Sequence, residues 1–164
     1  MARKRSVVGE RANVVGRFRI QISEDGRVVG DSGWHKNQIT NKGAELYFCE
    51  NLVGGANSRR VTHMGIGTGT APDATHNTTG LNGELASRVT VSTSLVGANS
   101  RTIQMTAQFA SSVFSTQGSK TIQNLGLMFT SQTNSGTILS GQTYTTSQWN
   151  SNQDVNATYQ IAFP

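Results

Sequence analysis

The stretch RVTVSTSLVGANSRTIQMTAQF, residues 88–109, decides the fold that we predict for this chain. Apolar and polar residues alternate through both of its halves, which is typical of β-strands that bury one face. Residues 97–100 between the halves include glycine, asparagine and serine, which favour a turn. We therefore predict two antiparallel strands, over residues 88–96 and 102–109. Their apolar members are Val89, Val91, Ile103, Met105, Ala107 and Phe109.

The same alternation predicts a hairpin near the start of the chain. Phe18, Ile20 and Ile22 alternate with polar residues, and the pair Asp25-Gly26 follows them. A type I′ turn needs positive φ angles, which glycine adopts without steric cost, so Asp-Gly is a strong hairpin signal. Further strands are predicted at residues 61–66, 121–129, 137–145 and 155–163.

One convincing helix is predicted, over residues 41–51. Thr40 or Asn41 provides an N-cap residue, and Gly43 weakens the helix slightly. Cys49 lies inside it and is expected to be a small buried hydrophobe. The residues that recur at helical spacings of three and four are Ala44, Tyr47, Phe48 and Leu52.

Together these elements predict a mainly β fold, an antiparallel β-sandwich or barrel-like domain with one short α-helix at about residues 41–51. A chain of 164 residues is long enough to bury its own core. We assign residues 14–164 to this single β-rich domain and residues 1–13 to an extended basic N-terminal arm.

Two stretches are nearly identical: LVGGANSRRVTHM at residues 52–64 and LVGANSRTIQM at residues 95–105. The first follows the helical pattern AELYFCEN, whereas the second follows the alternating pattern RVTVSTS. The shared letters therefore do not lie in equivalent structures. We interpret them as one kind of turn built twice, not as a duplicated domain.

The positive charge of the chain is concentrated at its start. The formal net charge is +5, and residues 1–19 account for all of it. The body of the domain therefore offers no broad positive field to a phosphate backbone, and we expect no nucleic-acid partner. An arm that docks on an acidic neighbouring surface, one that binds nucleic acid and a solvated tail remain the alternatives. The basic residues are Arg3, Lys4, Arg5, Arg11, Arg17 and Arg19.

The residues expected of an enzyme are sparse. The run GIGTGT at residues 65–70 lacks the βαβ context of a phosphate-binding loop. A glycan hydrolase needs two carboxylates about 5–10 Å apart, yet Asp154 is the only acid after Arg88. We expect a non-enzymatic protein with no catalytic residues, no metal and no cofactor. The histidines, for which no acid is placed to orient the ring, are His35, His63 and His76.

No stretch of the sequence has the apolar length of a secretory signal or a membrane span. Cys49 is the single cysteine, so neither an intramolecular disulfide nor a thiolate metal cage is expected. We expect the protein to be made in a cytoplasm and to have no membrane partner.

Two groups of residues are candidates for specific contacts. Glu84 and Arg88 stand four apart, the spacing at which side chains meet on a helical turn. We expect them to clip the long loop to the next strand, a contact worth about 0.3–0.5 kcal/mol if exposed. Flat aromatic rings stack on sugars, but they also serve as core or interface residues. The aromatic candidates are Trp34, Tyr144 and Trp149.

Five motifs follow one another between residues 39 and 163. They are ITNKGAELYF (39–48), VTHMGIGTGTAPDAT (61–75), LNGELASR (81–88), TIQNLGLMFTSQTNSGTILSGQTY (121–144) and YQIAF (159–163). This order resembles that of a group of small virion proteins of tailed bacteriophages. That group shares an ITNxG helix start, an aiGtGt strand exit, an LxxExxR clip, an i-x-x-x-GlF strand and a G-x-L-l-a strand. The chain departs from the group at Asn124, where an acid is more usual.

The resemblance implies a non-enzymatic part of a phage particle, of the kinds assigned to tail fibres, tails or capsid decoration. We expect a homo-oligomer, dimer or trimer, that docks on other virion proteins such as the major capsid protein or tail proteins. Its expected location is the virion, after synthesis in the bacterial host cytoplasm. Capsid decoration is preferred because the chain has no extended shaft. The alternative is a tail-fibre or other tail subunit, with lectin-like binding of host-surface glycans. The arm and the loop at residues 68–83 are the expected contact elements.

Overall fold

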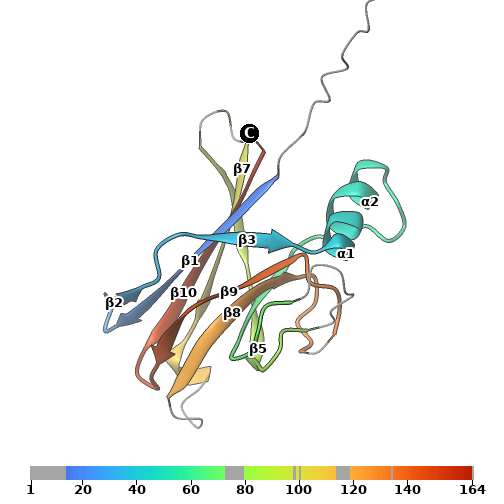
Figure 1. Cartoon of the computed structure of the whole chain (residues 1–164). Coiled ribbons are helices and arrows are strands. Elements are labelled where there is room, and N and C mark those ends of the chain that lie inside the picture. Colours follow the sequence, from blue (N-terminus) through green and yellow to red (C-terminus); the bar gives the residue numbers. More distant parts are fainter. Residues whose placement is uncertain are drawn as a thin grey trace, which may run out of the picture.

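The computed structural model describes residues 14–72, 80–97, 99, 101–113, 119–133 and 135–163, apart from the side chains of residues 86, 113 and 144–147. The described chain is mainly β with one short helical segment, as predicted (Figure 1). The expected arm at residues 1–13 lies outside the described residues. The strands are β1 (Val15–Glu24), β2 (Arg27–Asp31), β3 (His35–Ile39), β4 (His63–Gly67), β5 (Glu84–Thr90), β6 (Ser92–Val96), β7 (Thr102–Phe109), β8 (Lys120–Met128), β9 (Ser140–Trp149) and β10 (Asp154–Ala162). The helical elements are α1 (Asn41–Ala44), the π-helical turn η1 (Glu45–Cys49), α2 (Glu50–Leu52) and the 3-10 turn η3 (Ser111–Val113).

The ten strands form one antiparallel sheet in the order β5-β4-β8-β9-β3-β1-β10-β7-β6, and β2 pairs with β1 beside this path. The sheet curls into a half-barrel, the barrel-like member of the two predicted architectures (Figure 1). Its two edge strands, β5 and β6, are consecutive in the chain. Val91 links them, and its N–H donates to the carbonyl of Thr62 at 2.9 Å. The chain therefore passes from one edge of the sheet to the other at a single residue.

The core lies on the inner face of the curled sheet. Along β1 and β10, Phe18 pairs with Tyr159 and Ile20 with Ala157, and all four side chains are buried. The rings of Phe18 and Tyr159 stack with their centroids 6.4 Å apart. Alternate residues of a strand share a face, so the polar residues between them point outward. The alternation read in the sequence of β1 is thus confirmed.

The predicted strand over residues 88–96 is wrong in one respect, because it is two strands. Residues up to Thr90 belong to β5 and pair with β4, whereas residues from Ser92 belong to β6 and pair with β7. The alternation of apolar residues runs through Val91 without interruption. It reports which face each side chain occupies and carries no information about which neighbour each half pairs with.

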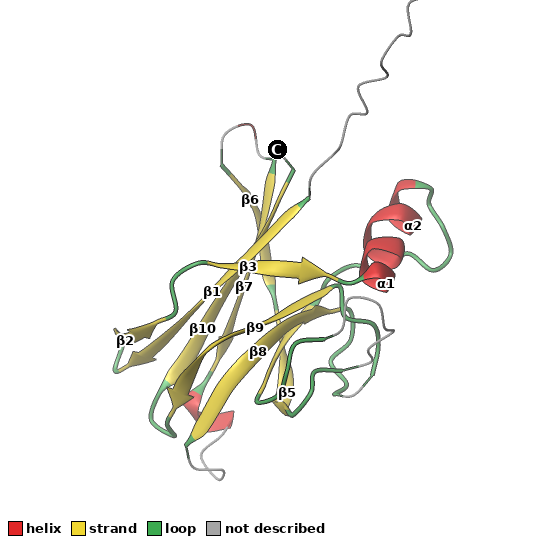
Figure 2. Cartoon of the chain, in the orientation of Figure 1, coloured by secondary structure: helices red, strands yellow, loops and turns green. Residues whose placement is uncertain are grey.

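The predicted hairpin at the start of the chain is confirmed. Asp25 has a φ of 49° and Gly26 a φ of 76°, as a type I′ turn requires between β1 and β2. Val28 and Val29 on β2 remain 57% and 56% exposed, so this hairpin projects from the main sheet. Figure 2 shows it at the opposite side of the half-barrel from the helical segment.

The helix predicted at residues 41–51 is confirmed within one residue. Its N-cap is Thr40, whose Oγ1 accepts a hydrogen bond from the N–H of Gly43 at 2.9 Å. The prediction for Cys49 is wrong, because this side chain is exposed. The buried stripe of the helix runs through Leu46 and Tyr47, and Cys49 lies outside it.

The two similar stretches lie in different structures, as interpreted from their flanks. The first begins at the end of α2 and leads into β4, whereas the second begins in β6 and turns into β7. Both turns use left-handed backbone, with a φ of 64° at Gly54, 85° at Gly97 and 60° at Asn99. Shared turn chemistry accounts for the shared letters.

Candidate functional site

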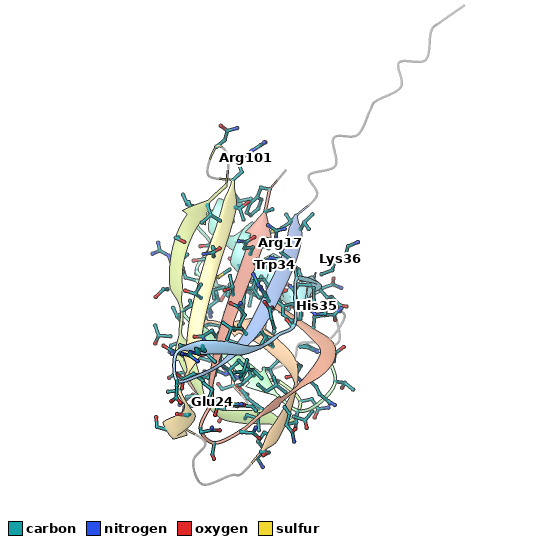
Figure 3. All side chains as sticks on the ribbon, turned by 90° about the vertical axis from the view of Figure 1, so that its left-hand side faces the viewer. Arg17, Glu24, Trp34, His35, Lys36 and Arg101 are labelled. Carbon is teal, nitrogen blue, oxygen red and sulfur yellow. The ribbon has the colours of Figure 1, made fainter. Side chains whose placement is uncertain are left out.

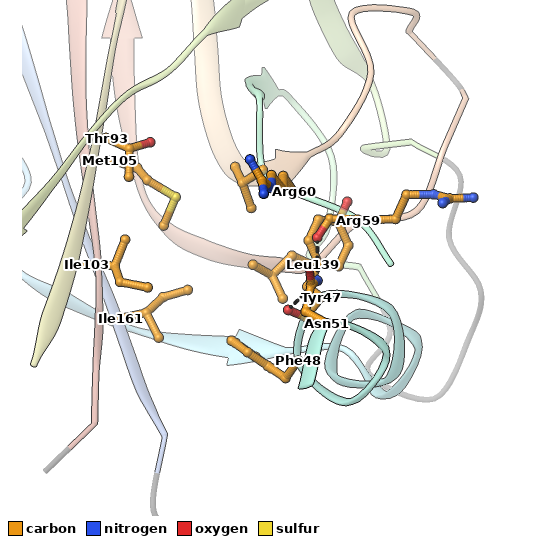
Figure 4. A pocket seen from close by; sticks show the side chains of 11 residues that line it. Tyr47, Phe48, Asn51, Arg59, Arg60, Thr93, Ile103, Met105, Leu139 and Ile161 are labelled. Atoms are coloured by element: carbon orange, nitrogen blue, oxygen red, sulfur yellow. Dashed lines mark hydrogen bonds between the residues drawn. The ribbon is translucent and has the colours of Figure 1, made fainter. Parts of the chain in front are cut away.

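A groove lies between the helical segment and the inner face of the sheet, at the open end of the half-barrel (Figure 4). Its volume is about 440 Å³. One wall is formed by β6, β7 and β10. The other is formed by the helix, by residues 59–61 of the segment that follows it, and by Leu139, which directly precedes β9. The residues that line it are Tyr47, Phe48, Asn51, Arg59, Arg60, Val61, Thr93, Ile103, Met105, Leu139 and Ile161.

The sheet wall continues the inner-face pattern of the core. Ile103 of β7 pairs with Ile161 of β10, and Leu95 of β6 pairs with Ile103. The three side chains therefore form one apolar row across neighbouring strands. Figure 4 shows Ile103 and Ile161 facing Phe48 across the groove. Leu95, at the end of the row, is 63% exposed.

The helix wall is fixed by side chains that bond to backbone carbonyls. The hydroxyl of Tyr47 donates to the carbonyl of Thr137 at 2.7 Å. The Nδ2 of Asn51 donates to the carbonyls of Tyr47 at 3.0 Å and Arg59 at 2.8 Å. Asn51 thus ties the end of the helix to the segment that returns towards β4. Phe48 completes this wall by an edge contact with the ring of Phe163, with centroids 6.1 Å apart.

The charged groups that line the groove are all cationic. The guanidinium of Arg59 lies over the ring of Phe129, 5.0 Å from its centroid, and Arg60 is exposed. No carboxylate lines the described groove. Burial raises the pKa of Tyr47, so its hydroxyl stays a neutral donor. Apolar walls beside two arginines suit an apolar group that carries a negative charge at its flank.

The helix ends in an exposed apolar pair that directly follows Asn51, one of the residues that line this groove. Leu52 is 86% and Val53 79% exposed, and both follow Asn51, which lines the groove. We call Leu52 and Val53 the helix tip. Isolated apolar side chains are common on surfaces, but two adjacent ones beside an apolar groove form a larger apolar area.

Of the six basic residues predicted as an interface, Arg17 and Arg19 lie in the described chain. They alternate with the buried residues of β1 and so lie on its outer face, where Figure 3 labels Arg17. The guanidinium of Arg17 lies 4.7 Å from the centroid of the Trp34 ring, and its Nε donates to Gln160 at 2.8 Å. Arg19 forms an ion pair with Asp31 and holds the pKa of that carboxyl well below its usual range. Both arginines thus already have partners within the chain. The four that lie outside the described residues are Arg3, Lys4, Arg5 and Arg11.

The structure separates the three aromatic candidates. Trp34 is 43% exposed, with Arg17 over its ring. Trp149 is 1% exposed, and its indole N–H donates to the carbonyl of Gln153. Of the two roles considered for Trp149, stacking on a sugar is therefore corrected to a place in the core. Tyr144 belongs to β9, and its side chain lies outside the described residues.

Glu84 and Arg88 do meet, but on strand β5, not on a helical turn, and the pair is buried, not exposed. The Nε of Arg88 lies 2.5 Å from Oε1 of Glu84, and Nη2 lies 3.1 Å from Oε2. The Nη1 of Arg88 also donates to the carbonyls of Thr130 at 3.2 Å and Ser135 at 2.8 Å. The pair therefore clips β5 to the segment that follows β8, which corrects its predicted geometry and partner.

Asn124 is a buried polar residue whose amide group binds three backbone carbonyls. Its Nδ2 lies 2.9 Å from the carbonyl of Gly69, 3.0 Å from that of Thr70 and 3.0 Å from that of Asn82. A Cβ added at Gly67 would come within 2.4 Å of Asn124 Oδ1. The glycine run thus lets backbone segments approach Asn124 closely. This explains the run without a phosphate ligand.

The described histidines have local partners. His35 Nε2 lies 2.8 Å from the carbonyl of Ser32, and His63 Nδ1 lies 2.8 Å from Thr62 Oγ1. His76 lies outside the described residues. Among the residues that the structure describes, no three His, Cys, Asp or Glu side chains gather as metal ligands. No helix in the described part of the chain is long and apolar enough to cross a membrane.

Sequence reasoning did not predict the groove or the helix tip. The available signal was Leu52-Val53 directly before two glycines, an apolar pair at the point where the helical stripe ends. Comparison with protein-family models, curated proteins and solved structures gave no match.

Proposed function

We propose that this chain is a non-enzymatic structural protein of a tailed-bacteriophage particle, which self-associates and docks on the virion as a capsid-decoration or cement subunit. One observation carries the proposal. The motifs that resemble those of small phage virion proteins are far apart in the sequence, yet they contact one another in the fold.

The helix-start motif contacts the motif around β9. The hydroxyl of Thr40 donates to the carbonyl of Ile138 at 2.6 Å. A Cβ added at Gly43 would lie 2.3 Å from the carbonyl oxygen of Leu139, so glycine is required where the start of the helix contacts the residue before β9. The ITNKG and GTILSG stretches that carry the resemblance are thus in direct contact in the fold.

The strand-exit motif (61–75), the clip motif (81–88) and the β8 part of the motif at 121–144 meet around β8. Asn124 of the β8 motif bonds to the strand-exit motif at Gly69 and to the start of the clip motif at Asn82. Arg88 at the end of the clip bonds to Thr130, just after β8. Contact between these distant stretches supports a shared architecture, since chance similarities between short sequences would be scattered over the fold. Asn124 itself stands where the group more usually has an acid, so its hydrogen bonds are particular to this chain.

The outer face of the sheet carries a ladder of hydrogen-bonded polar side chains in which Gln160 and Gln104 are neutral. Arg17 donates to Gln160 at 2.8 Å, and Gln160 donates to Gln104 at 2.7 Å, in a ladder across β1, β10 and β7. Neutral polar groups bind a partner at a smaller desolvation cost than charged ones. Modest contacts per subunit then add up on a symmetric lattice such as a capsid.

Immunogold labelling of intact particles with an antibody to this chain tests the proposal. Label spread evenly over heads is the expected result, and antibody absorbed beforehand with the purified protein is the control. Label confined to the tail would support the alternative of a tail-fibre or other tail subunit. Particles without label would contradict both locations.

A second candidate function, binding of host-surface glycans, is favoured by one observation. Trp34 presents a partly exposed ring on the polar outer face of the sheet. Titration of host polysaccharide against tryptophan fluorescence tests it, because the buried Trp149 does not report on surface binding. A saturable change that Trp34→Ala abolishes would support glycan binding, and an unchanged signal would contradict it.

A further inference from the structure

The helix tip and the groove have complementary surfaces. Leu52 and Val53 are the most exposed of the large apolar side chains that the structure describes. The groove beside them is lined mainly by apolar side chains and is open to solvent. Removing an apolar pair or an apolar groove from water is favourable, so both features are expected to be covered.

Charge is complementary as well. Glu50 lies two residues before Leu52 of the helix tip. Arg59 and Arg60 line the groove, and no acid lines it with them among the described residues. Neither arginine forms an ion pair among the described residues. A helix tip from another molecule would therefore bring its own carboxylate to an unpaired cation.

The positions of the two features favour a two-fold arrangement. Phe48 and Asn51 line the groove, and Leu52 and Val53 follow them on the same short helix. Two copies related by a two-fold axis beside this helix would each place a tip in the other's groove. Such an interface closes on itself, so it yields a dimer and not an open chain.

We propose that a second copy of this chain occupies the groove, with its Leu52 and Val53 against Phe48, Ile103 and Ile161, and with its Glu50 near Arg60. The interface rests on the self-association included in the proposed function and assigns it to specific residues. The chain's own N-terminal residues are a poorer occupant. Residues 1–13 carry four basic side chains and one acid, which Arg59 and Arg60 would repel.

The first test is sedimentation velocity of the full chain over a wide range of concentrations. Wild-type protein is expected to sediment as a dimer, and the double variant Leu52→Ser with Val53→Ser as a monomer. The matched control is Val28→Ser with Val29→Ser, which also removes two adjacent exposed apolar side chains but at the β1–β2 hairpin. The control is expected to remain a dimer.

Charge exchange is the second test. Glu50→Arg and Arg60→Glu are each expected to weaken association about tenfold, and the double exchange is expected to restore it. Both side chains are at least partly exposed, so folding is expected to persist, and circular dichroism checks this. Restoration in the double variant requires that the two residues meet across the interface.

Several results would overturn the proposal. They are a wild-type monomer at every concentration, a dimer that survives the helix-tip variant, and a small apolar molecule retained in the groove by native mass spectrometry. Immunogold labelling of virions is independent of all three. A monomer that still labels virion heads would refute this interface and the self-association, and would leave the proposed place of the chain in the virion standing.

Discussion

Arg88 and Glu84 form an ion pair in which the two side chains are only 0% and 1% exposed. They reach each other along a strand because β5 bulges. Leu85 pairs with Ile66 and Val89 with Met64, so four residue steps of β5 face two steps of β4. The bulge shortens the path between the two side chains. The pair that the sequence predicted as a clip thus lies in the interior of the protein.

Replacement of Arg88 by methionine is expected to lower the free energy of unfolding by about 3–5 kcal/mol, because it leaves the Glu84 carboxylate buried without its partner. Urea unfolding followed by tryptophan fluorescence measures the change. The control is Arg19→Met, which breaks an exposed pair with Asp31 and is expected to lower the free energy of unfolding far less, because solvent screens that pair. Equal losses in the two variants would contradict a structural role for the buried pair.

Asn124→Asp is expected to destabilise the fold by about 3 kcal/mol at neutral pH, since a buried carboxylate would then face three carbonyl oxygens. Burial would raise the pKa of the new carboxyl group, so the loss should be present at neutral pH and shrink as the pH falls and the group becomes a neutral donor. Thermal unfolding at several pH values measures this trend. Asn57→Asp, at an exposed turn, is the matched control and should show little change. A loss that grew towards low pH would contradict the assignment.

Gly43→Ala is expected to destabilise the protein by about 1–3 kcal/mol, although alanine favours a helix more than glycine does by about 1 kcal/mol. The new Cβ would lie 2.3 Å from the carbonyl oxygen of Leu139, and backbone cannot move aside easily. Differential scanning calorimetry measures the shift in Tm. Lys42→Ala, at the neighbouring position, is the control and should change Tm little. A rise in Tm for Gly43→Ala would show that Gly43 does not lie so close to the backbone of Leu139.

Much of the fold was predictable because local patterns determine it. The alternation of β1, β7 and β10 indicates one buried face on each strand. Asp25-Gly26 favours a turn because of the backbone preferences of these two residues alone. The helix was equally readable from its cap and stripe. Each of these features depends on residues that are close together in the sequence.

The remainder depends on contacts between distant segments. The break at Val91 was hidden because β5 and β6 keep one continuous alternation while they pair at opposite edges of the sheet. The groove was hidden because its walls come from a helix and from strands that lie about 40 to 110 residues further on. Cys49 is exposed although burial was expected, and Trp149 takes the core role among the two that were considered for it. Only the tertiary fold decides which face of an element is covered.

Alkaline pH provides a last test, through two buried tyrosines. Burial raises the pKa of Tyr47 and of Tyr159 above the ordinary value, so the folded state keeps protons that the unfolded state releases. This contribution to stability is fully present below about pH 10 and is lost as the pH rises further, by about 1.4 kcal/mol per pH unit for each tyrosine. At neutral pH the free energy of unfolding of Tyr47→Phe is expected to be about 1 kcal/mol lower than that of the wild type, because the variant loses the hydrogen bond to Thr137. Above about pH 10 its free energy of unfolding should then fall less steeply, because one of the two tyrosines is gone. The two curves of unfolding free energy against pH should therefore converge. Parallel curves would mean that the hydroxyl of Tyr47 is solvated in the folded protein.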